Sequence, residues 1–486
     1  MRKKLFRERL EVDKITRKYD ERTGKFTIDV RFRVAVKITE RTARVAEAFG
    51  VDLHGNDEYV LYDEFRVKIG RGDIVLITGD SGSGKSVLLR ELAKDLGSDR
   101  ILDINAIKVK EDEPIIETVG ESLQEGLSLL SRVGLNDASL FLRSYRQLSE
   151  GQKYRYRLAK LIEAGKPYWV IDEFCSLLDR ETAKIVAFNV QKQARREGCS
   201  LLAATTHTDI LEDLNPSVHI LKGWGKEVKV EYRPNVEKSV CSVTEKLAVT
   251  EGSLEDYHKL SRFHYRGGPL QAPDRIFKLV REDGETVGVI VYSFPYLRCF
   301  GRNEVLNGKL TIRELNRLLR TINRVILHPK YRGIGQGVRL VKETLQKVGV
   351  PYVETVAVMA RYNPFFEKAG MVKVKEKKPS EDTLRALEEL RRLGINPLFT
   401  ASLPYTKKKI DAFSKSQIEA VKRILLQLGE ELFRFKRVLT GTKYPDKAEL
   451  EEAIAKASKE KIARALRTIS IESQTKVYLI WKNPTY

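Results

Sequence analysis

The chain contains 486 residues, of which 42% are apolar and 32% charged, and it carries a formal net charge of +21. This composition allows ordinary hydrophobic cores, and the length has room for about three domains. No apolar run reaches the ~18–20 residues that a membrane span requires, and the first residues lack the apolar core of a signal peptide. The cysteines form no C-x-x-C pair, which argues against a zinc or iron–sulfur site and for a reducing compartment. We therefore expect a cytoplasmic protein without membrane spans.

The first motif is a glycine-rich loop that ends in Gly-Lys-Ser. The sequence GDSGSGKS follows an apolar run at residues 74–77 and precedes a helical pattern at residues 87–92. This strand–loop–helix setting is the one in which a GxxxxGK[ST] match indicates phosphate binding by backbone N–H groups. In such a loop Lys85 reaches the β- and γ-phosphates, and the Ser86 hydroxyl holds Mg²⁺. The predicted ATP-binding residues are Gly79, Asp80, Ser81, Gly82, Ser83, Gly84, Lys85 and Ser86.

Two further motifs follow in order. Residues 168–171, Tyr-Trp-Val-Ile, predict a buried strand that ends at Asp172 and Glu173. An aspartate at such a strand end holds Mg²⁺. The adjacent glutamate is placed to polarise the attacking water. Upstream, the sequence LSEGQ resembles the LSGGQ signature of the ATP-binding-cassette (ABC) ATPases. The signature residues are Leu148, Ser149, Glu150, Gly151 and Gln152.

The resemblance to ABC ATPases extends to a D-loop that ends at Asp179 and to a switch histidine, His207, after an apolar strand. It implies that two ATP molecules are enclosed between two head-to-tail cassettes. Ser149 of one cassette then binds the γ-phosphate held by the P-loop of the other. The chain holds one such set, so the resemblance implies a homodimer or a partner cassette, and we expect a homodimer with Asp179 at the ATP. Glu173 and His207 are its expected catalytic residues.

Two features depart from the ABC pattern. Glu150 replaces a glycine of the signature, and no glutamine stands clearly in the Q-loop position before residues 115–119. The aromatic residue that stacks on adenine stays open among Phe49, Tyr59 and Tyr62. The short interval between the P-loop and the signature favours a cassette outside transport, with a separate membrane subunit as the alternative.

Strand patterns predict where the cassette begins and ends. Residues 26–36 alternate apolar and mostly polar side chains, which predicts a half-buried strand of an antiparallel layer. Residues 228–232 predict the strand that closes the cassette. We therefore expect an α/β P-loop domain over residues 1–235.

A second glycine motif lies far downstream. The sequence RGIGQG, residues 332–337, follows a strand-like run at residues 324–327 and opens a helical pattern at residues 338–345. Glycines between a strand and a helix expose N–H groups and a helix N-terminus to an anion. A structural turn has the same pattern, so the motif alone leaves both interpretations open.

The surrounding sequence, HPKYRGIGQG, resembles the pyrophosphate loop of the GNAT acyltransferases. Further matches to that family are a helix at 253–260, hairpin strands at 275–280 and 287–292, and a strand at 352–358. The resemblance implies an α+β GNAT domain, expected over residues 236–380, with acetyl-CoA between the strands at 324–327 and 352–358. The residues implied in acetyl-CoA binding are Ile326, Leu327, His328, Arg332, Gly333, Ile334, Gly335, Gln336, Gly337 and Asn363.

The residues that would move protons during acyl transfer are less clearly marked. The reaction needs an acceptor for the amine proton and often a donor for the leaving thiolate. Many GNAT relatives use a tyrosine in the late helix as the donor, and Phe366 stands there in this chain. Tyr362 and Glu354 are the catalytic candidates, although a glutamate in a strand is more typical of a structural role, as is His328 beside a proline. A binding-only acyl-CoA module is the alternative.

Residues 381–486 predict a basic helical extension. Leucine and isoleucine spacings at residues 384–390 and 418–428 predict packing faces. Residues 476–481 predict a strand that could complete the GNAT sheet. Basic clusters such as Lys407–Lys408–Lys409 favour either a nucleic-acid clamp or a solvated face, and the net charge shifts the balance toward polyanions.

These motifs together predict an ABC-type ATPase coupled to an acetyl-CoA-dependent N-acetyltransferase. The expected cofactors are ATP, Mg²⁺ and acetyl-CoA. The expected acceptor is a large substrate, with structured RNA favoured by the charge. Two rival interpretations are a protein N-acetyltransferase and a non-catalytic acyl-CoA sensor joined to an ABC motor.

Overall fold

The computed structural model describes residues 10–34, 38–50, 58–264, 270–306, 308, 310–361, 363–428, 433–442 and 445–486. The chain divides into two compact units, each of which is discontinuous in sequence. The first comprises residues 1–268, 276–290 and 325–340, and the second comprises residues 269–275, 291–324 and 341–486. This division differs from the three consecutive domains expected from the sequence.

The first unit begins with a three-stranded antiparallel sheet in the order β1-β2-β3. The half-buried strand predicted at its centre is confirmed, because Phe26, Ile28, Val30 and Phe32 are buried on one face. Helix α1 follows β2; Thr39 caps its start and Gly50 ends it with a left-handed φ of 65°. The bounds are β1 Leu10–Asp20, β2 Lys25–Val34, α1 Glu40–Phe49 and β3 Glu58–Lys68.

A second sheet has the order β5-β6-β7-β4-β8-β9, with β9 alone antiparallel to its neighbour. The predicted closing strand corresponds to β9. Because parallel strands end at one edge, the segments after β4, β6 and β7 meet there. The bounds are β4 Ile74–Gly79, β5 Ile101–Asp103, β6 Tyr168–Ile171, β7 Ser200–Thr205, β8 Val218–Lys222 and β9 Val228–Tyr232.

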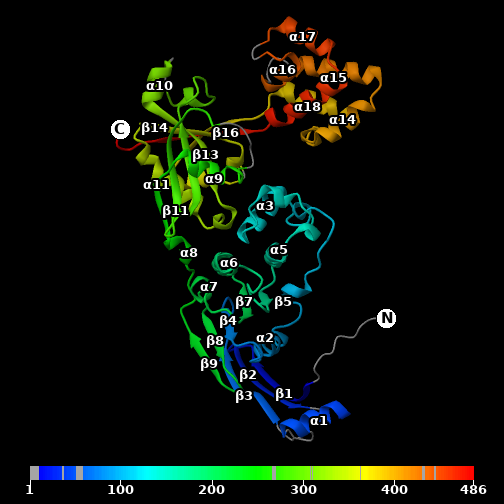
Figure 1. The fold of residues 1–486 in the computed structure, drawn as a ribbon, viewed down its shortest axis with the longest axis vertical. Helices are drawn as coiled ribbons and strands as arrows, with labels where there is room; N and C mark the ends of the chain where they lie inside the picture. The colour runs from blue at the N-terminus through cyan, green and yellow to red at the C-terminus, as the bar shows by residue number, and fades with distance from the viewer. Residues whose placement is uncertain are drawn as a thin grey trace. The chain divides into compact units, whose positions relative to one another are not determined.

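Both faces of the second sheet are covered (Figure 1). Ile74 and Leu76 of β4 pack with helices α3, α5 and α6, whereas Val75 and Ile77 face helix α2 and the first sheet. This alternation explains why the strand reads as a continuous apolar run. The helices of this region are α2 Lys85–Lys94, α3 Leu123–Arg132, α4 Ala138–Phe141, α5 Glu150–Glu163, α6 Arg180–Glu197, α7 Leu211–Leu214 and α8 Ser242–Glu245.

A third sheet has the strand order β10-β11-β12-β13-β14-β16-β15. Strands β13 and β14 are parallel, and their pairing covers only residues 319–321 opposite residues 352–354. The predicted C-terminal strand joins this sheet, because β16 pairs antiparallel with both β14 and β15. The bounds are β10 Leu247–Glu251, β11 Pro273–Arg281, β12 Thr286–Ser293, β13 Leu319–Leu327, β14 Tyr352–Ala357, β15 Val372–Lys377 and β16 Lys476–Lys482.

Short helices accompany this sheet. They are α9 Leu254–Ser261, α10 Ile312–Leu318, α11 Gln336–Leu345 and α12 Phe365–Lys368. Helix α11 begins inside the second glycine motif, as the sequence predicts.

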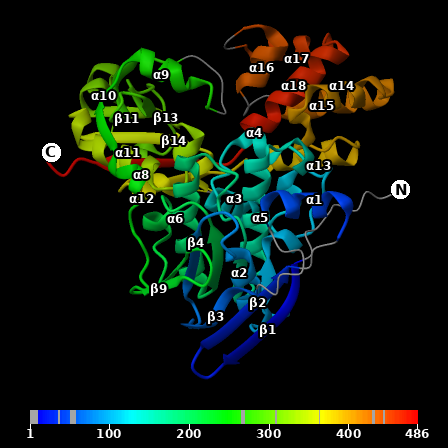
Figure 2. The same cartoon turned by 60° about the horizontal axis from the view of Figure 1, so that its bottom comes forward.

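Helices α13 to α18 lie between β15 and β16 in sequence and share one apolar core (Figure 2). The packing face predicted for residues 418–428 is confirmed, since Ile418, Val421, Leu425 and Leu428 are all buried. In α13 the prediction fails at Leu384, whose side chain is exposed. No helix in the described part of the chain is long and apolar enough to cross a membrane. The bounds are α13 Glu381–Arg392, α14 Leu403–Asp411, α15 Lys415–Leu428, α16 Phe433–Thr440, α17 Lys447–Ala455 and α18 Lys459–Glu472.

Candidate functional site

Two glycines of the first loop are required by close contacts. Gly79 has a φ of 150°, and a Cβ there would lie 2.1 Å from the carbonyl oxygen of Lys222. Gly84 has a φ of 101°, and a Cβ there would lie 2.7 Å from Leu61 Cδ1. Only glycine fits both positions, so the loop closes tightly over β3 and β8 before α2 begins.

Lys85 and Ser83 place polar groups inside this loop. The Lys85 ammonium donates to the carbonyl oxygen of Asp80 at 2.7 Å. Burial lowers the pKa of Lys85, and the nearby carboxylates of Glu173 and Asp172 oppose that shift. The Ser83 hydroxyl is buried and has no hydrogen-bond partner among the described residues. A glycine cradle with a cation and an orphaned hydroxyl fits a triphosphate bound through backbone N–H groups.

The carboxylates after β6 stand on an unusual turn. Glu173 and Cys175 have left-handed φ values of 54° and 60°, which non-glycine residues rarely adopt. The turn is held by the Cys175 N–H, which donates to the Tyr154 hydroxyl at 3.0 Å. The Glu173 carboxylate is exposed and accepts a hydrogen bond from Ser176 Oγ at 2.9 Å. Strained backbone of this kind is typical of functional sites, and here it presents Glu173 beside the half-buried Asp172.

The signature forms the start of α5. Ser149 is the N-cap, and its side chain and that of Gln152 form a reciprocal capping box. Leu148 is buried beneath it, and a Cβ on Gly151 would lie 3.2 Å from Leu178 Cδ2, so the signature packs on the D-loop. Glu150, which departs from the ABC pattern, is exposed and pairs with Lys153.

His207 and Asp179 lie on either side of these motifs. His207 follows β7, is half-buried, and its backbone N–H donates to Thr205 Oγ1 at 3.2 Å. Asp179 is the N-cap of α6 and accepts a hydrogen bond from the Thr182 N–H at 3.1 Å. Asp179 also pairs with Lys330, a contact that no sequence motif indicated.

One of the candidates for adenine stacking is excluded. Tyr62 is fully buried beneath the loop, where its hydroxyl donates to the Gly84 carbonyl oxygen at 3.1 Å and the Lys222 ammonium lies 5.1 Å from its ring centre. Tyr62 therefore supports the P-loop and cannot stack on a base. Phe49 and Tyr59 are exposed.

In the second glycine loop, the side chain of Arg332 binds backbone carbonyl groups of the protein itself. Gly333 and Gly335 have left-handed φ values of 85° and 83°. The Arg332 guanidinium donates to the carbonyl oxygens of Leu327, Asn136 and Phe263 at 2.8–3.0 Å. Burial lowers its pKa. The Arg332 guanidinium therefore braces the loop through backbone carbonyls, and phosphate binding by the backbone of residues 332–337 stays a prediction.

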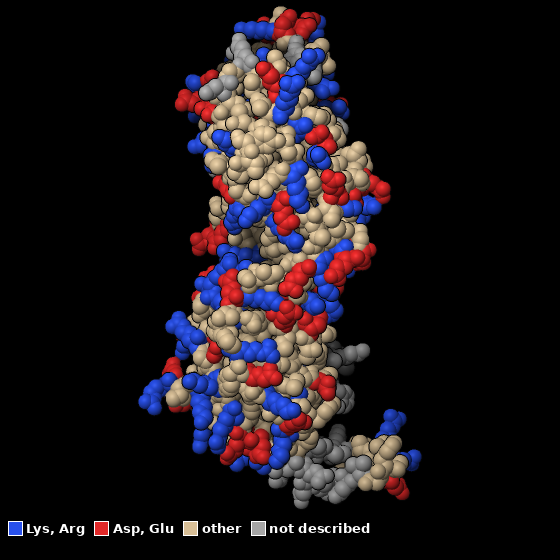
Figure 3. Space-filling view, turned by 90° about the vertical axis from the view of Figure 1, so that its left-hand side faces the viewer, with Lys and Arg blue, Asp and Glu red and all other residues tan. Residues whose placement is uncertain are grey.

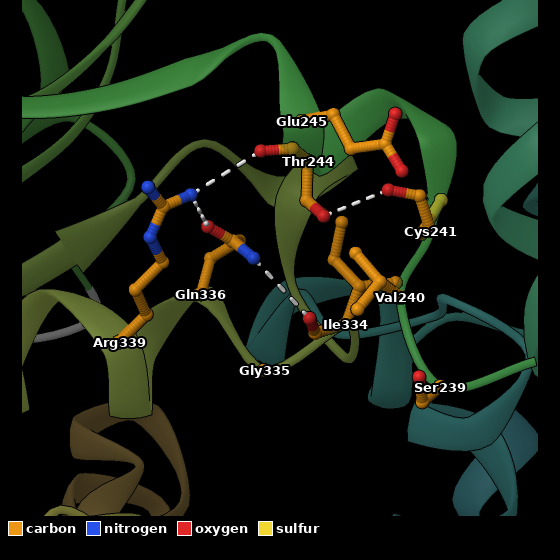
Figure 4. Close-up of a pocket in the computed structure, with 9 residues that line it drawn as sticks. All are labelled: Ser239, Val240, Cys241, Thr244, Glu245, Ile334, Gly335, Gln336 and Arg339. Carbon is orange, nitrogen blue, oxygen red and sulfur yellow. Dashed lines mark hydrogen bonds between the residues drawn. The ribbon is translucent and has the colours of Figure 1, made fainter.

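A hollow of about 370 Å³ lies beside this loop, next to the start of α11 (Figure 4). A Cβ on Gly335 would meet nothing within 4 Å, so its backbone is accessible. Arg339 donates to the carbonyl oxygens of Thr244 and Leu247, and Gln336 Nε2 donates to the Ile334 carbonyl oxygen. The hollow is lined by Ser239, Val240, Cys241, Thr244, Glu245, Ile334, Gly335, Gln336 and Arg339.

Glu354 serves as a buried structural anion rather than an exposed base. Its oxygens accept bonds from Arg302 Nη2 at 2.6 Å, Arg302 Nε at 3.0 Å, Thr321 Oγ1 at 3.0 Å and the Tyr478 hydroxyl at 3.0 Å. Arg302 also donates to the Tyr296 carbonyl oxygen at 2.7 Å. The prediction of Glu354 as a catalytic residue is corrected, because every carboxylate oxygen is occupied.

The remaining acyl-transfer candidates have separate environments. Tyr362 lies outside the described residues. Phe366 is buried, Asn363 is exposed, and Ile326 is buried in β13. The His328 backbone N–H donates to the Val287 carbonyl oxygen at 2.8 Å, and burial lowers the pKa of its imidazole.

Comparisons with known proteins agree with the motifs of the first unit. Residues 62–176 match the family model described as ABC transporter. The cytochrome c biogenesis ATP-binding export protein CcmA of Colwellia psychrerythraea is 29% identical over 183 residues, which cover 32% of this chain and 82% of that protein. ABC transporter I family member 1 of Arabidopsis thaliana is 27% identical over 171 residues, which cover 30% of this chain and 75% of that protein.

A solved dimeric ATP-binding cassette bound to ADP and phosphate is 19% identical, with a TM-score of 0.31, and the match covers 37% of this chain and 93% of that one. Nothing further follows at that score. The family match and the ordered motifs of the P-loop, signature and β6 carboxylates lead to one conclusion: the N-terminal region is an ABC-type ATPase domain with a P-loop α/β fold.

Proposed function

We propose that this chain couples ATP hydrolysis in its ABC-type domain to acetyl-CoA-dependent N-acetyl transfer. The third sheet is the observation that supports the proposed N-acetyl transfer. Its parallel strands β13 and β14 stop pairing after Thr321 and Glu354, and a glycine loop with an accessible backbone at Gly335 follows β13. This strand order and loop support a GNAT-like arrangement, in which an acyl-CoA enters between two parallel strands.

The ATPase half follows from the residues of the first loop and its neighbours. Ser86 and Asp172 would hold Mg²⁺, which when bound neutralises charge on the phosphates. Lys85 holds the terminal phosphates, and Glu173 orients and polarises the attacking water. Ser149 is exposed at the start of α5, so it is free to reach a nucleotide on a second copy. A homodimer therefore belongs to the proposal.

The acyl-transfer half needs a nucleophilic amine from an acceptor. The amine nitrogen forms a bond to the thioester carbon while the carbon–sulfur bond breaks. The nitrogen loses a proton to solvent, and the thiolate of CoA takes up a proton from a donor and leaves as the thiol. Tyr362 is the proposed proton donor to the thiolate. Glu354 has no part in this proposal, because its oxygens hold Arg302 and Tyr478.

Changing Gly335 tests the acyl-CoA half. Gly335→Leu should lower acetyl-CoA affinity at least about tenfold, since a side chain would cover the backbone N–H groups and strain a φ of 83°. Gly349→Leu is the matched control, because Gly349 also has a left-handed φ and open space beside it. Calorimetry on both variants should show unchanged ATP affinity. Equal acetyl-CoA affinity in the Gly335 variant and the wild type would contradict the proposal.

The acceptor class is proposed from charge. A net charge of +21 favours RNA through release of counter-ions. Figure 3 shows a face on which basic and acidic side chains are interspersed, and Lys407 is paired with Glu460. On that face the two signs of charge are mixed, and one lysine of the predicted run has an acidic partner.

Transfer from labelled acetyl-CoA should identify the acceptor. Incubating the full chain with ATP and separate RNA and protein fractions should label RNA. Label in protein amines alone would favour protein acetylation, and binding of acetyl-CoA without transfer to either fraction would favour an acyl-CoA sensor.

A second candidate function is that of an ATPase subunit for a membrane partner. The relatives reported above are named as an export protein and as an ABC transporter member. ATP turnover that rises only in the presence of a membrane fraction would favour this candidate over acyl transfer.

A further inference from the structure

An ion-pair cluster joins the D-loop to the residues that precede the second glycine loop, all within the first unit. Lys330 Nζ lies 3.0 Å from Asp179 Oδ1 and 3.2 Å from Glu181 Oε2. Glu181 also accepts a hydrogen bond from the Tyr331 hydroxyl at 3.2 Å and pairs with Arg281 at 3.0 Å. The start of α6 is therefore held by side chains from outside the nucleotide motifs.

The charge states in this cluster favour a persistent contact. Burial alone would lower the pKa of Lys330, but hydrogen bonds to Asp179 and Glu181 outweigh burial and raise the pKa overall. Burial alone would raise the pKa of Asp179, but bonds from Thr182 and Lys330 lower it. Both groups stay charged around neutral pH. The side chain of Lys330 is 28% exposed and that of Asp179 is 57% exposed, so the contact is sheltered mainly on the side of Lys330.

A second contact holds the same loop against the helical part of the cassette. Arg332 Nη1 donates to the Asn136 carbonyl oxygen at 2.8 Å. A Cβ on Gly333 would lie 3.1 Å from the Ser131 carbonyl oxygen. Residues 330–333 therefore touch the cassette at two places, the start of α6 and the end of α3 with the segment that follows it.

The D-loop leads directly to the hydrolytic carboxylate. Ser176 Oγ donates to Glu173 Oε2 at 2.9 Å, and the Ser176 N–H donates to the Glu173 carbonyl oxygen at 3.1 Å. The Leu178 N–H donates to the Cys175 carbonyl oxygen at 3.3 Å. These bonds make residues 173–179 a compact turn that ends at Asp179. Asp179 is thus separated from Glu173 only by a short run of hydrogen-bonded residues.

We propose that Lys330 is a positioning residue of the ATPase, which fixes Asp179 and, through the turn, the orientation of Glu173. The polar partners of Lys330 are Asp179 and Glu181. It acts through the D-loop. The same contact makes binding at the two glycine loops interdependent, and this second part rests on the acyl-CoA function proposed above. Coupling of binding is reciprocal, so each ligand changes the affinity of the other by the same factor.

Steady-state ATPase kinetics on the full chain test the positioning role. Lys330→Met should lower kcat about tenfold and change KM less than about twofold, because binding of ATP by the P-loop is untouched. Lys330→Arg should restore kcat to within about twofold of the wild type. Lys347→Met, at an exposed lysine after α11, is the matched control and should leave kcat unchanged. The double variant Asp179→Asn, Lys330→Met should be no slower than the slower single variant.

Wild-type kcat in a folded Lys330→Met variant would overturn the positioning role, as would a Lys330→Arg variant that stays folded and as slow as Lys330→Met. Calorimetry with acetyl-CoA, with and without a non-hydrolysable ATP analogue, tests the coupling. The coupling is supported if the ATP analogue changes the acetyl-CoA affinity of the wild type but not that of Lys330→Met. It is contradicted if the analogue leaves the acetyl-CoA affinity of the wild type unchanged. If acetyl-CoA does not bind at all, the proposed function fails, and the kcat result on Lys330 stands by itself.

Discussion

Replacing Glu173 by glutamine should reduce ATP turnover at least about a hundredfold while ATP binding is preserved, since general-base assistance contributes about 10²–10⁴-fold. The amide keeps the shape of the side chain and can still accept the hydrogen bond from Ser176. It loses the negative charge that polarises water. The variant should also accumulate as a closed dimer with ATP trapped between cassettes, measurable by light scattering at saturating Mg·ATP.

Two controls make this result specific. Glu64→Gln changes an exposed glutamate that also has a left-handed φ, 46°, and it should leave turnover unchanged. Lys85→Ala should abolish ATP binding itself, because it removes the cation held inside the loop. Full hydrolysis by the Glu173 variant would contradict the role assigned to this carboxylate.

The second large effect concerns stability. Glu354→Ala should lower the free energy of unfolding of the second unit by about 3–5 kcal/mol, because removal of one member of a buried ion pair leaves the other charge without compensation. The side chains of Arg302 and Glu354 are only 5% and 1% exposed. The loss should also free the Tyr478 hydroxyl, which donates to the same carboxylate. Denaturant unfolding, followed by fluorescence, measures the change.

Glu304→Ala is the matched control for this prediction. Glu304 lies two residues from Arg302 and pairs with Lys375, and both partners are about half exposed. An exposed pair contributes at most about 1 kcal/mol, so this variant should unfold close to the wild type. Equal stability of the two variants would show that Arg302 finds other partners when Glu354 is removed.

The nucleotide motifs could be predicted from the sequence because each one is local. The glycine loop, the β6 carboxylates and the signature each occupy a few consecutive residues, and their order along the chain adds specificity. Lys222 and Leu61, which pack against Gly79 and Gly84, could not be found in this way. They come from distant strands, and a lysine or leucine at a strand carries no local mark of lying beneath a phosphate loop.

The same limit explains the correction of Glu354 and the contacts of Arg332 that the sequence did not indicate. Glu354 stands between Val353 and Thr355 in a strand, a setting shared by a catalytic base and by one half of a buried pair. Its partner Arg302 begins a short 3₁₀ turn between β12 and α10, in a stretch without a periodic pattern. Arg332 matched a family motif by residue type, whereas its role follows from three carbonyl groups brought together only by folding.

The placement of α13 to α18 has a consequence for how the chain is assembled. Strands β15 and β16 are antiparallel neighbours, and Lys377 of one stands opposite Lys476 of the other. Residues 378–475 thus connect two strand ends that are paired with each other. A tight turn could connect the same two ends. The entropy of closing so long a connection grows only slowly with its length, and it falls further if the helices fold first. Helices α13 to α18 are therefore an insertion between two paired strands. A change in the length or sequence of this insertion is expected to disturb the pairing of β15 with β16 little.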